Sequence, residues 1–199
     1  MNVLQINSSI FTDGGQSTRL ATDFVERWTQ NHPDSQVTVR DFAAEEVPHL
    51  SAETFQAFLA KPEERNADQQ AAVDYSDRLI AELHAADVVV LGLPMYNFGV
   101  PSQLKAYFDH VARAGITFKY TENGPVGLLG KQKVYVLAAR GGKYQGTPRD
   151  TQTKYVTDFF NFLGITDVEF IYAEGLNMGD TPREQALSDA HKVIDQIAA

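Results

Sequence analysis

The sequence contains no cysteine among its 199 residues. Disulfide bonds, thiol nucleophiles and cysteine-ligated metal or iron–sulfur sites are therefore excluded, and a reducing compartment is favoured over a secretory one. The longest nearly uninterrupted apolar run, 88–96, has about nine residues, too few to span a bilayer. The first residues carry no basic cluster, so we expect no signal peptide and a cytoplasmic protein.

A basic face is also missing. The net charge is −9, and the Lys and Arg residues are scattered, so we expect no nucleic-acid partner and no membrane partner. The five histidines show no paired spacing of the kind that metal ligands have, and no metal site is expected. Hydrophobic residues make up 43% of the chain, and its length suits one domain over residues 1–199.

Short apolar runs alternate with amphipathic segments along the whole chain. We expect strands at 3–6, 37–39, 87–93, 133–139 and 168–173. The third run is apolar throughout, which is typical of a parallel strand buried on both faces. Helical patterns lie between the runs, and Ser17 or Thr18 is expected to cap the first helix. The pattern predicts an α/β fold with a doubly wound five-stranded parallel sheet and helices on both faces. Segments 44–66 and 117–130 are expected to interrupt it.

Ligands of such sheets bind beyond the carboxyl ends of the strands, where the strand order reverses. The loop after the first strand carries Ser9, Gly14-Gly15 and Ser17 and then opens a helix, whose free N–H groups attract an anion. An ordinary glycine–serine turn is the alternative interpretation. The glycine-rich signatures of dinucleotide-binding and P-loop proteins are absent.

The loops after the third and fourth strands offer other groups. The segment 94–102 reads PMYNFGVPS, and its Met95, Tyr96 and Phe98 suit the face of a planar ring, although a packed aromatic corner is an alternative. The segment 140–144 reads RGGKY and offers backbone N–H groups and a guanidinium to negative charge. Its alternative is a helix-entry turn with a solvated arginine.

These residues belong to longer stretches: 94–98 with 104–109 (LKAYFD), 111–115 (VARAG), 118–125 (FKYTENGP), 140–142 and 162–165 (FLGI). Together they make the chain similar, nearly from end to end, to the family of FMN-dependent NADH azoreductases and NADH:quinone oxidoreductases. The resemblance implies a flavodoxin-like fold with strand order 2-1-3-4-5. It also implies FMN as cofactor, NADH or NADPH as electron donor, and a homodimer with FMN sites near the subunit interface.

The resemblance also implies roles for individual residues. The phosphate would be held by Ser9 and the turn Gly15-Gln16-Ser17. The isoalloxazine would be lined by Pro94, Met95, Tyr96, Asn97 and Phe98, and its pyrimidine edge would be bound by Ala139, Arg140, Gly141 and Gly142. The substrate pocket would include Tyr120, Phe162 and Tyr144. Family members often have serine in place of Gly15 and Ala139, so we expect FMN binding to be weaker by roughly 1 kcal/mol.

The function implied is a two-step hydride transfer at one site. NADH (or NADPH) reduces FMN in the first half-reaction, and a quinone or aromatic azo compound accepts the electrons in the second. The flavin carries the hydride at N5, and no protein residue is expected to act as catalytic base or nucleophile. The alternatives are a flavodoxin-like electron carrier, a flavin-binding regulatory module without NADH turnover, or a reductase that releases reduced FMN to a partner.

Overall fold

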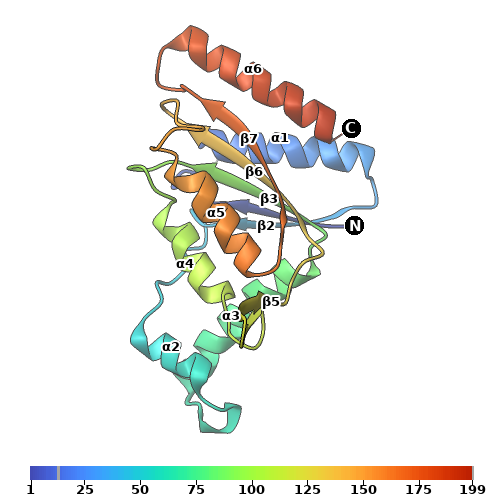
Figure 1. Ribbon diagram of the computed structural model, residues 1–199. Coiled ribbons are helices and arrows are strands. Elements are labelled where there is room, and N and C mark those ends of the chain that lie inside the picture. The colour runs from blue at the N-terminus through green and yellow to red at the C-terminus, as the bar shows by residue number, and fades with distance from the viewer. Residues whose placement is uncertain (13, 199) are drawn as a thin grey trace.

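The computed structural model describes residues 1–12 and 14–198. A five-stranded parallel sheet in the order β2-β1-β3-β6-β7 forms its centre (Figure 1). Its strands are β1 (Asn2–Asn7), β2 (Gln36–Asp41), β3 (Val88–Pro94), β6 (Lys133–Arg140) and β7 (Asp167–Glu174). With only the strands of this sheet counted, the order is 2-1-3-4-5. The predicted flavodoxin-like, doubly wound topology is therefore confirmed.

Helices cover both faces of the sheet (Figure 1). On one face lie α1 (Gln16–Asn31) and α6 (Asp180–Ile197). On the other lie α3 (Ala67–Ala85), α4 (Ser102–Val111) and α5 (Thr151–Phe162). Each layer has its own apolar core against the sheet, and the two cores share β3 as their central strand.

The residue pattern explains this arrangement. Every residue of β3 is buried, as its uniform apolar character predicts. Its side chains alternate in direction, so that Val89 and Leu91 pack with the α3–α5 layer while Val90 packs with the α1–α6 layer. In α1, Leu20 and Phe24 lie one turn apart on the buried stripe, together with Trp28.

Two excursions leave the alternating pattern. Segment 44–66 contains α2 (Ala52–Leu59) and the short 3-10 helix η1 (Pro62–Glu64), in agreement with the irregular or short-helical segment expected there. Segment 117–130 was expected only as an interruption, but it forms an antiparallel hairpin of β4 (Phe118–Thr121) and β5 (Gly124–Gly127). In Figure 1, α2 and this hairpin lie at the same end of the molecule, away from α6.

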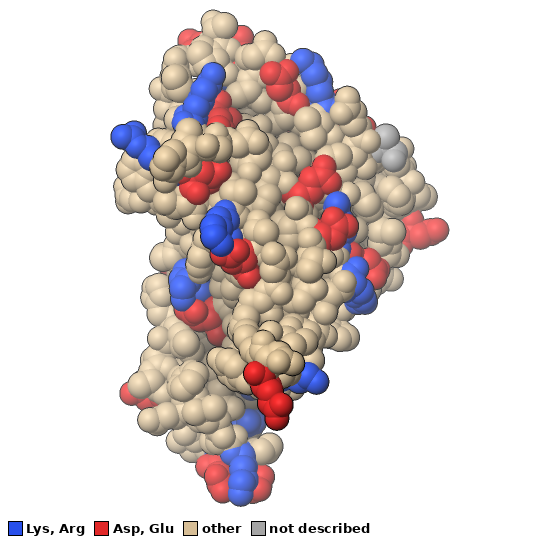
Figure 2. Space-filling model, in the orientation of Figure 1, with Lys and Arg blue, Asp and Glu red and all other residues tan. Residues whose placement is uncertain are grey.

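Charged residues are mixed on the surface. Figure 2 shows Lys and Arg side chains next to Asp and Glu side chains over the visible face, without a continuous area of one sign. Among the described residues, no helix combines the length and apolar character needed to cross a membrane. In the same residues no group of three or more His, Asp or Glu side chains could hold a metal ion.

Candidate functional site

Three loops meet at the carboxyl edge of the sheet, where the strand order reverses between β1 and β3. The backbone N–H and the hydroxyl of Ser8 both donate to the carbonyl of Gly92, at 3.3 and 2.7 Å, which ties the first loop to β3. The N–H of Met95 donates to the carbonyl of Ala139 at 3.3 Å, which ties the second loop to β6. The sheet therefore brings together the loops that the sequence singled out.

Gly15 is the N-cap of α1, and it has no side chain with which to cap the first N–H groups. Ser17 and Thr18 do not occupy the cap position, so the cap prediction was wrong. Ser17 and Thr18 instead lie inside the helix, and their buried hydroxyls have no hydrogen-bond partner among the residues that the structure describes. No acidic residue occupies the first turn. N–H groups and hydroxyls at a helix N-terminus that lack other partners can bind an anion.

Gly15 is needed for the close approach of the loop to the helix. A Cβ atom added at Gly15 would lie 2.4 Å from Ser9 Oγ and 2.8 Å from Ser9 Cβ. The second distance does not change when the Ser9 hydroxyl rotates, so any side chain at position 15 requires the backbone to move. Ser9 itself is buried, and its hydroxyl lies 3.3 Å from the hydroxyl of Tyr96. The anion site and the second loop are thus in direct contact.

The second loop contains a strained turn. Asn97 and Phe98 have φ values of 50° and 63°, in the left-handed region, and both residues are exposed. This conformation costs about 1–3 kcal/mol for each non-glycine residue unless its surroundings hold it. Two backbone hydrogen bonds between Tyr96 and Gly99, of 3.2 and 2.9 Å, close the turn. Pro94 itself is the last residue of β3 and is buried.

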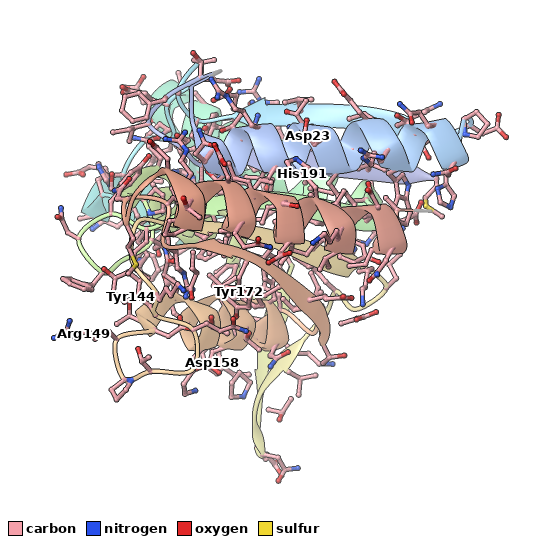
Figure 3. The ribbon with its side chains drawn as sticks, turned by 90° about the horizontal axis from the view of Figure 1, so that it is seen from above. Asp23, Tyr144, Arg149, Asp158, Tyr172 and His191 are labelled. Atoms are coloured by element: carbon pink, nitrogen blue, oxygen red, sulfur yellow. The ribbon has the colours of Figure 1, made fainter. Side chains whose placement is uncertain are left out.

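An open pocket of about 450 Å³ lies between the second and third loops. It is lined by Met95, Asn97, Phe98, Gly141, Gly142, Tyr144 and Asn177. The rings of Phe98 and Tyr144 meet edge to face, 5.7 Å between centroids. A Cβ at Gly141 would lie 2.6 Å from the Asn177 amide nitrogen, so glycine keeps the backbone accessible there. In Figure 3, Tyr144 projects from the loop at this edge of the sheet.

Arg140 does not face this pocket. Its side chain is 0% exposed and forms ion pairs with Asp150 at 2.9 Å and with Glu174 at 3.0 Å. Burial opposes ionisation of Asp150, but hydrogen bonds from Arg140 and Thr153 lower its pKa overall. The guanidinium is therefore neutralised inside the protein. Both sequence interpretations of this side chain, a donor to the ligand and a solvated arginine, were wrong. Ala139 is also buried, and its carbonyl is used by Met95.

Tyr120 and Phe162 lie far from the pocket of the three loops in the folded chain. The Phe162 ring packs on Phe118 of the hairpin, 4.3 Å between centroids, at the end of α5 opposite to the three loops. The helix rises roughly 16 Å between Thr151 and Phe162. Tyr120 is 74% exposed and lines a separate, mainly apolar groove of about 340 Å³. Within one chain, these two residues and Tyr144 therefore do not line one pocket. The groove's other lining residues are Leu50, Phe55, Phe58, Leu59, Asp109, Ala112, Arg113, Ala114 and Phe118.

Comparison with known proteins agrees with the geometry. A family model described as "Flavodoxin-like fold" matches residues 1–198. The chain belongs to this flavodoxin-like family. It is 59% identical over 198 residues, 99% of this chain and 98% of the relative, to an FMN-dependent NADH:quinone oxidoreductase of Cellvibrio japonicus. A relative of the same name from Alcanivorax borkumensis is 55% identical over 194 residues, 98% of each chain. The family resemblance expected from the sequence is thereby confirmed.

Solved structures of similar proteins carry related names. An azoreductase from Bacillus anthracis (Sterne) superposes with a TM-score of 0.91 at 29% identity, covering 100% of this chain and 98% of that one. An FMN-dependent NADH-azoreductase from Bacillus anthracis (Ames Ancestor), solved in complex with FMN, gives a TM-score of 0.89 at 27% identity. That comparison covers 99% of this chain and 97% of the other.

Three residues around the site of this flavodoxin-like protein were not predicted from the sequence. Asn177 lines the pocket from the loop after β7, while Glu174 and Gln152 support the loops from behind. Asn177 follows a strand of the sheet, so its position at the carboxyl edge was a usable signal. Glu174 and Gln152 act through contacts with residues distant in the sequence, which no local pattern reveals.

Proposed function

We propose that this chain is an FMN-dependent oxidoreductase that takes hydride from NADH and passes electrons to quinones and aromatic azo compounds in two successive half-reactions. The observation that carries the proposal is the start of α1, where the glycine N-cap offers no side chain and two buried hydroxyls have no partner among residues 1–12 and 14–198, beside an aromatic-rimmed pocket. The names of the relatives, FMN-dependent NADH:quinone oxidoreductase, support the same activity.

The phosphate of FMN fits the first loop. The N–H groups of Gln16, Ser17 and Thr18 point out of the helix start, and the Ser17 and Thr18 hydroxyls are buried without a partner in the described part of the chain. A phosphate supplies acceptors for all of these donors and lies at the favourable end of the helix dipole. Ser9 closes the same site from the loop side.

The ring of FMN fits the pocket between the second and third loops. Met95 and Phe98 offer polarizable and aromatic surface to the ring, and Tyr96, tied to Ser9 and to the N–H of Ile10, holds the second loop beside the phosphate site. When bound, FMN supplies the carrier that accepts two electrons from NADH and returns them to the acceptor.

Backbone groups take the role expected of the Arg140 side chain. Among the described residues, the N–H groups of Gly141 and Gly142 have no backbone acceptor, while their carbonyls accept from Asn177 and Gly175. With FMN bound, these two N–H groups would stabilise negative charge on the pyrimidine edge of the ring. Because the carbonyls of Gly141 and Gly142 are tied to Asn177 and Gly175, the two N–H groups would need no reorganisation when that charge develops.

The substrate pocket is completed by a second copy of the chain. The groove of Tyr120 is lined mainly by apolar side chains, with Phe55 and Leu59 exposed on its α2 side. Tyr120 and Phe162 lie at the opposite end of α5 from Tyr144, so one chain cannot place all three residues in one pocket. In a dimer, the groove of one subunit would cover the pocket of the other. A homodimer thus joins both parts of the site. The lack of cysteine suits a reducing cytoplasm.

Steady-state kinetics test this function. NADH and benzoquinone, varied together with FMN-loaded protein, are expected to give parallel reciprocal plots, because the donor product leaves before the acceptor binds. NADPH serves as the matched alternative donor. Intersecting plots would refute the two-step scheme, and the absence of NADH oxidation would refute the enzyme and favour an electron carrier.

Mixing two inactive variants tests the shared pocket. One variant carries Phe98→Ala in the pocket of the three loops, and the other carries Tyr120→Ala in the groove. In a shared pocket, refolding an equal mixture restores about a quarter of the normal turnover, because half of the dimers are mixed and each contains one intact site. A mixture with no more activity than its components would place both residues in the same subunit's site.

A further inference from the structure

A buried network of side chains connects the two loops that form the pocket. At its centre, the Arg140 guanidinium donates to the carboxylates of Asp150 and Glu174. Glu174 in turn accepts hydrogen bonds from the N–H groups of Tyr144 and Gln145, each at 3.0 Å. Glu174 therefore anchors the third loop to the Arg140 guanidinium. Asp150, at the start of α5, binds the same guanidinium.

Gln152 extends this network to the second loop. Its side chain is completely buried, and its amide oxygen accepts from Arg140 Nε at 3.2 Å. Its amide nitrogen donates to the carbonyls of Pro94 at 2.8 Å and Gly99 at 3.0 Å. Both donor hydrogens are thus used on the two residues that flank the strained turn, and Arg140 fixes which end of the amide faces that turn.

We propose that Gln152 is a positioning residue: its amide, oriented by Arg140, holds the Asn97–Phe98 turn in its left-handed conformation and locks it to the third loop. This inference rests on the proposed function, since the turn and the third loop would hold the ring of FMN. Gln152 touches neither cofactor nor substrate, because it lies behind the turn and contacts only its backbone.

The strain of the turn explains why such support is needed. Asn97 and Phe98 adopt backbone angles that non-glycine residues rarely adopt, and both residues are exposed, although the Phe98 ring meets Tyr144 edge to face. Besides the two backbone hydrogen bonds between Tyr96 and Gly99, carbonyls of the turn accept hydrogen bonds from Gln152 at its two ends and from the Thr151 hydroxyl at Phe98. Removing the buried donor should let the turn relax to an ordinary conformation.

The test compares Gln152→Leu and Gln152→Glu with a matched control, Gln132→Leu. Gln132 is also a buried amide; its nitrogen donates to the carbonyl of Leu83 and its oxygen accepts from the N–H of Gly130. It follows β5 and precedes β6, at the opposite end of the sheet from the site. Gln152→Glu keeps an acceptor for Arg140, but its ionised carboxylate cannot donate to the carbonyls of the turn.

The first measurement is hydrogen exchange of the Tyr96 and Gly99 amides in FMN-free protein. Both Gln152 variants should exchange about tenfold faster than the wild type at these two amides, and Gln132→Leu should match the wild type there. Exchange that is unchanged in the folded Gln152→Glu variant would overturn the proposal. This result does not depend on whether the protein binds FMN.

The second measurement joins the inference to the function. With FMN-loaded protein, both Gln152 variants should raise the Kd for FMN about tenfold, change the visible circular dichroism of the bound flavin and raise KM more than they lower kcat. If Gln132→Leu changed these quantities equally, the effect of Gln152 would be one of general protein stability, and the positioning role would be overturned. Failure of the wild type to bind FMN would refute the proposed function, while the exchange result still decides the inference.

Discussion

Replacing Ser17 with alanine should change protein stability and cofactor affinity in opposite directions. In the FMN-free protein the Ser17 hydroxyl is fully buried and has no hydrogen-bond partner within residues 1–12 and 14–198. Its burial therefore opposes folding, and its removal recovers part of a desolvation cost of about 1–3 kcal/mol. Alanine is also the better helix former. We expect the free energy of unfolding to rise by about 1 kcal/mol, which raises Tm by roughly 2–4 °C in a domain of this size.

With FMN the same hydroxyl gains a charged partner. A hydrogen bond to a charged group contributes about 1.5–3 kcal/mol, so Ser17→Ala should raise the Kd for FMN roughly 10- to 150-fold. The assays are thermal unfolding of the FMN-free protein and titration with FMN followed by flavin fluorescence.

Ser35→Ala provides the matched control. Its hydroxyl is also buried without a partner in the part of the chain that the structure describes, but it lies next to the start of β2, at the opposite end of the strands. It should show the gain in stability without the loss of affinity. Unchanged FMN affinity in Ser17→Ala, or a less stable FMN-free protein, would refute the assignment of the phosphate site.

Three other perturbations follow from the same geometry. Gly15→Ser should weaken FMN binding, measured by titration, because the new Cβ would lie 2.8 Å from Ser9 Cβ. Tighter binding would contradict this and would show that this chain's affinity is limited by its lack of the serine found in other family members. Arg140→Met should lower the free energy of unfolding by about 3–5 kcal/mol in chemical denaturation, because Asp150 and Glu174 lose their buried partner; a loss below 1 kcal/mol would contradict that reading. The pKa of Asp150 is lowered by its hydrogen bonds to Arg140 and Thr153, so its stabilising contribution is complete above its usual pKa of 3.8 and lost as the pH falls through the lower folded value. In acid unfolding, Asp150→Asn should therefore differ most from the wild type above pH 3.8 and converge with it below; a constant difference would contradict the shift.

Local pattern was sufficient for most of the sheet. The uniformly apolar run of β3 and the apolar stripe of α1 define the centre of the fold, and the loop positions follow because parallel strands end at one edge. The hairpin of β4 and β5 was missed although Asn123-Gly124 is a hairpin signal in the sequence; in the structure the two strands are joined by residues 122–123, and Gly124 begins β5.

The orientation of Arg140 was beyond local pattern. Its partners Asp150 and Glu174 lie 10 and 34 residues away along the chain. Only the pairing of β6 with β7 and the start of α5 bring them together behind the strand. The position of the α1 N-cap was also beyond local pattern. Ser17 and Thr18 stand near the helix start in the sequence, but the helix begins one residue earlier and places both inside its first turn, behind the N-cap Gly15.

An anaerobic titration of the FMN-loaded protein with NADH, followed by visible absorption, tests the central claim most directly. One equivalent of NADH should bleach the flavin band directly to the two-electron reduced state, and benzoquinone added afterwards should restore it. Bound flavin that stays unchanged with NADH would contradict the enzyme and leave a carrier or regulatory protein, while no flavin binding at all would contradict the assignment of the site.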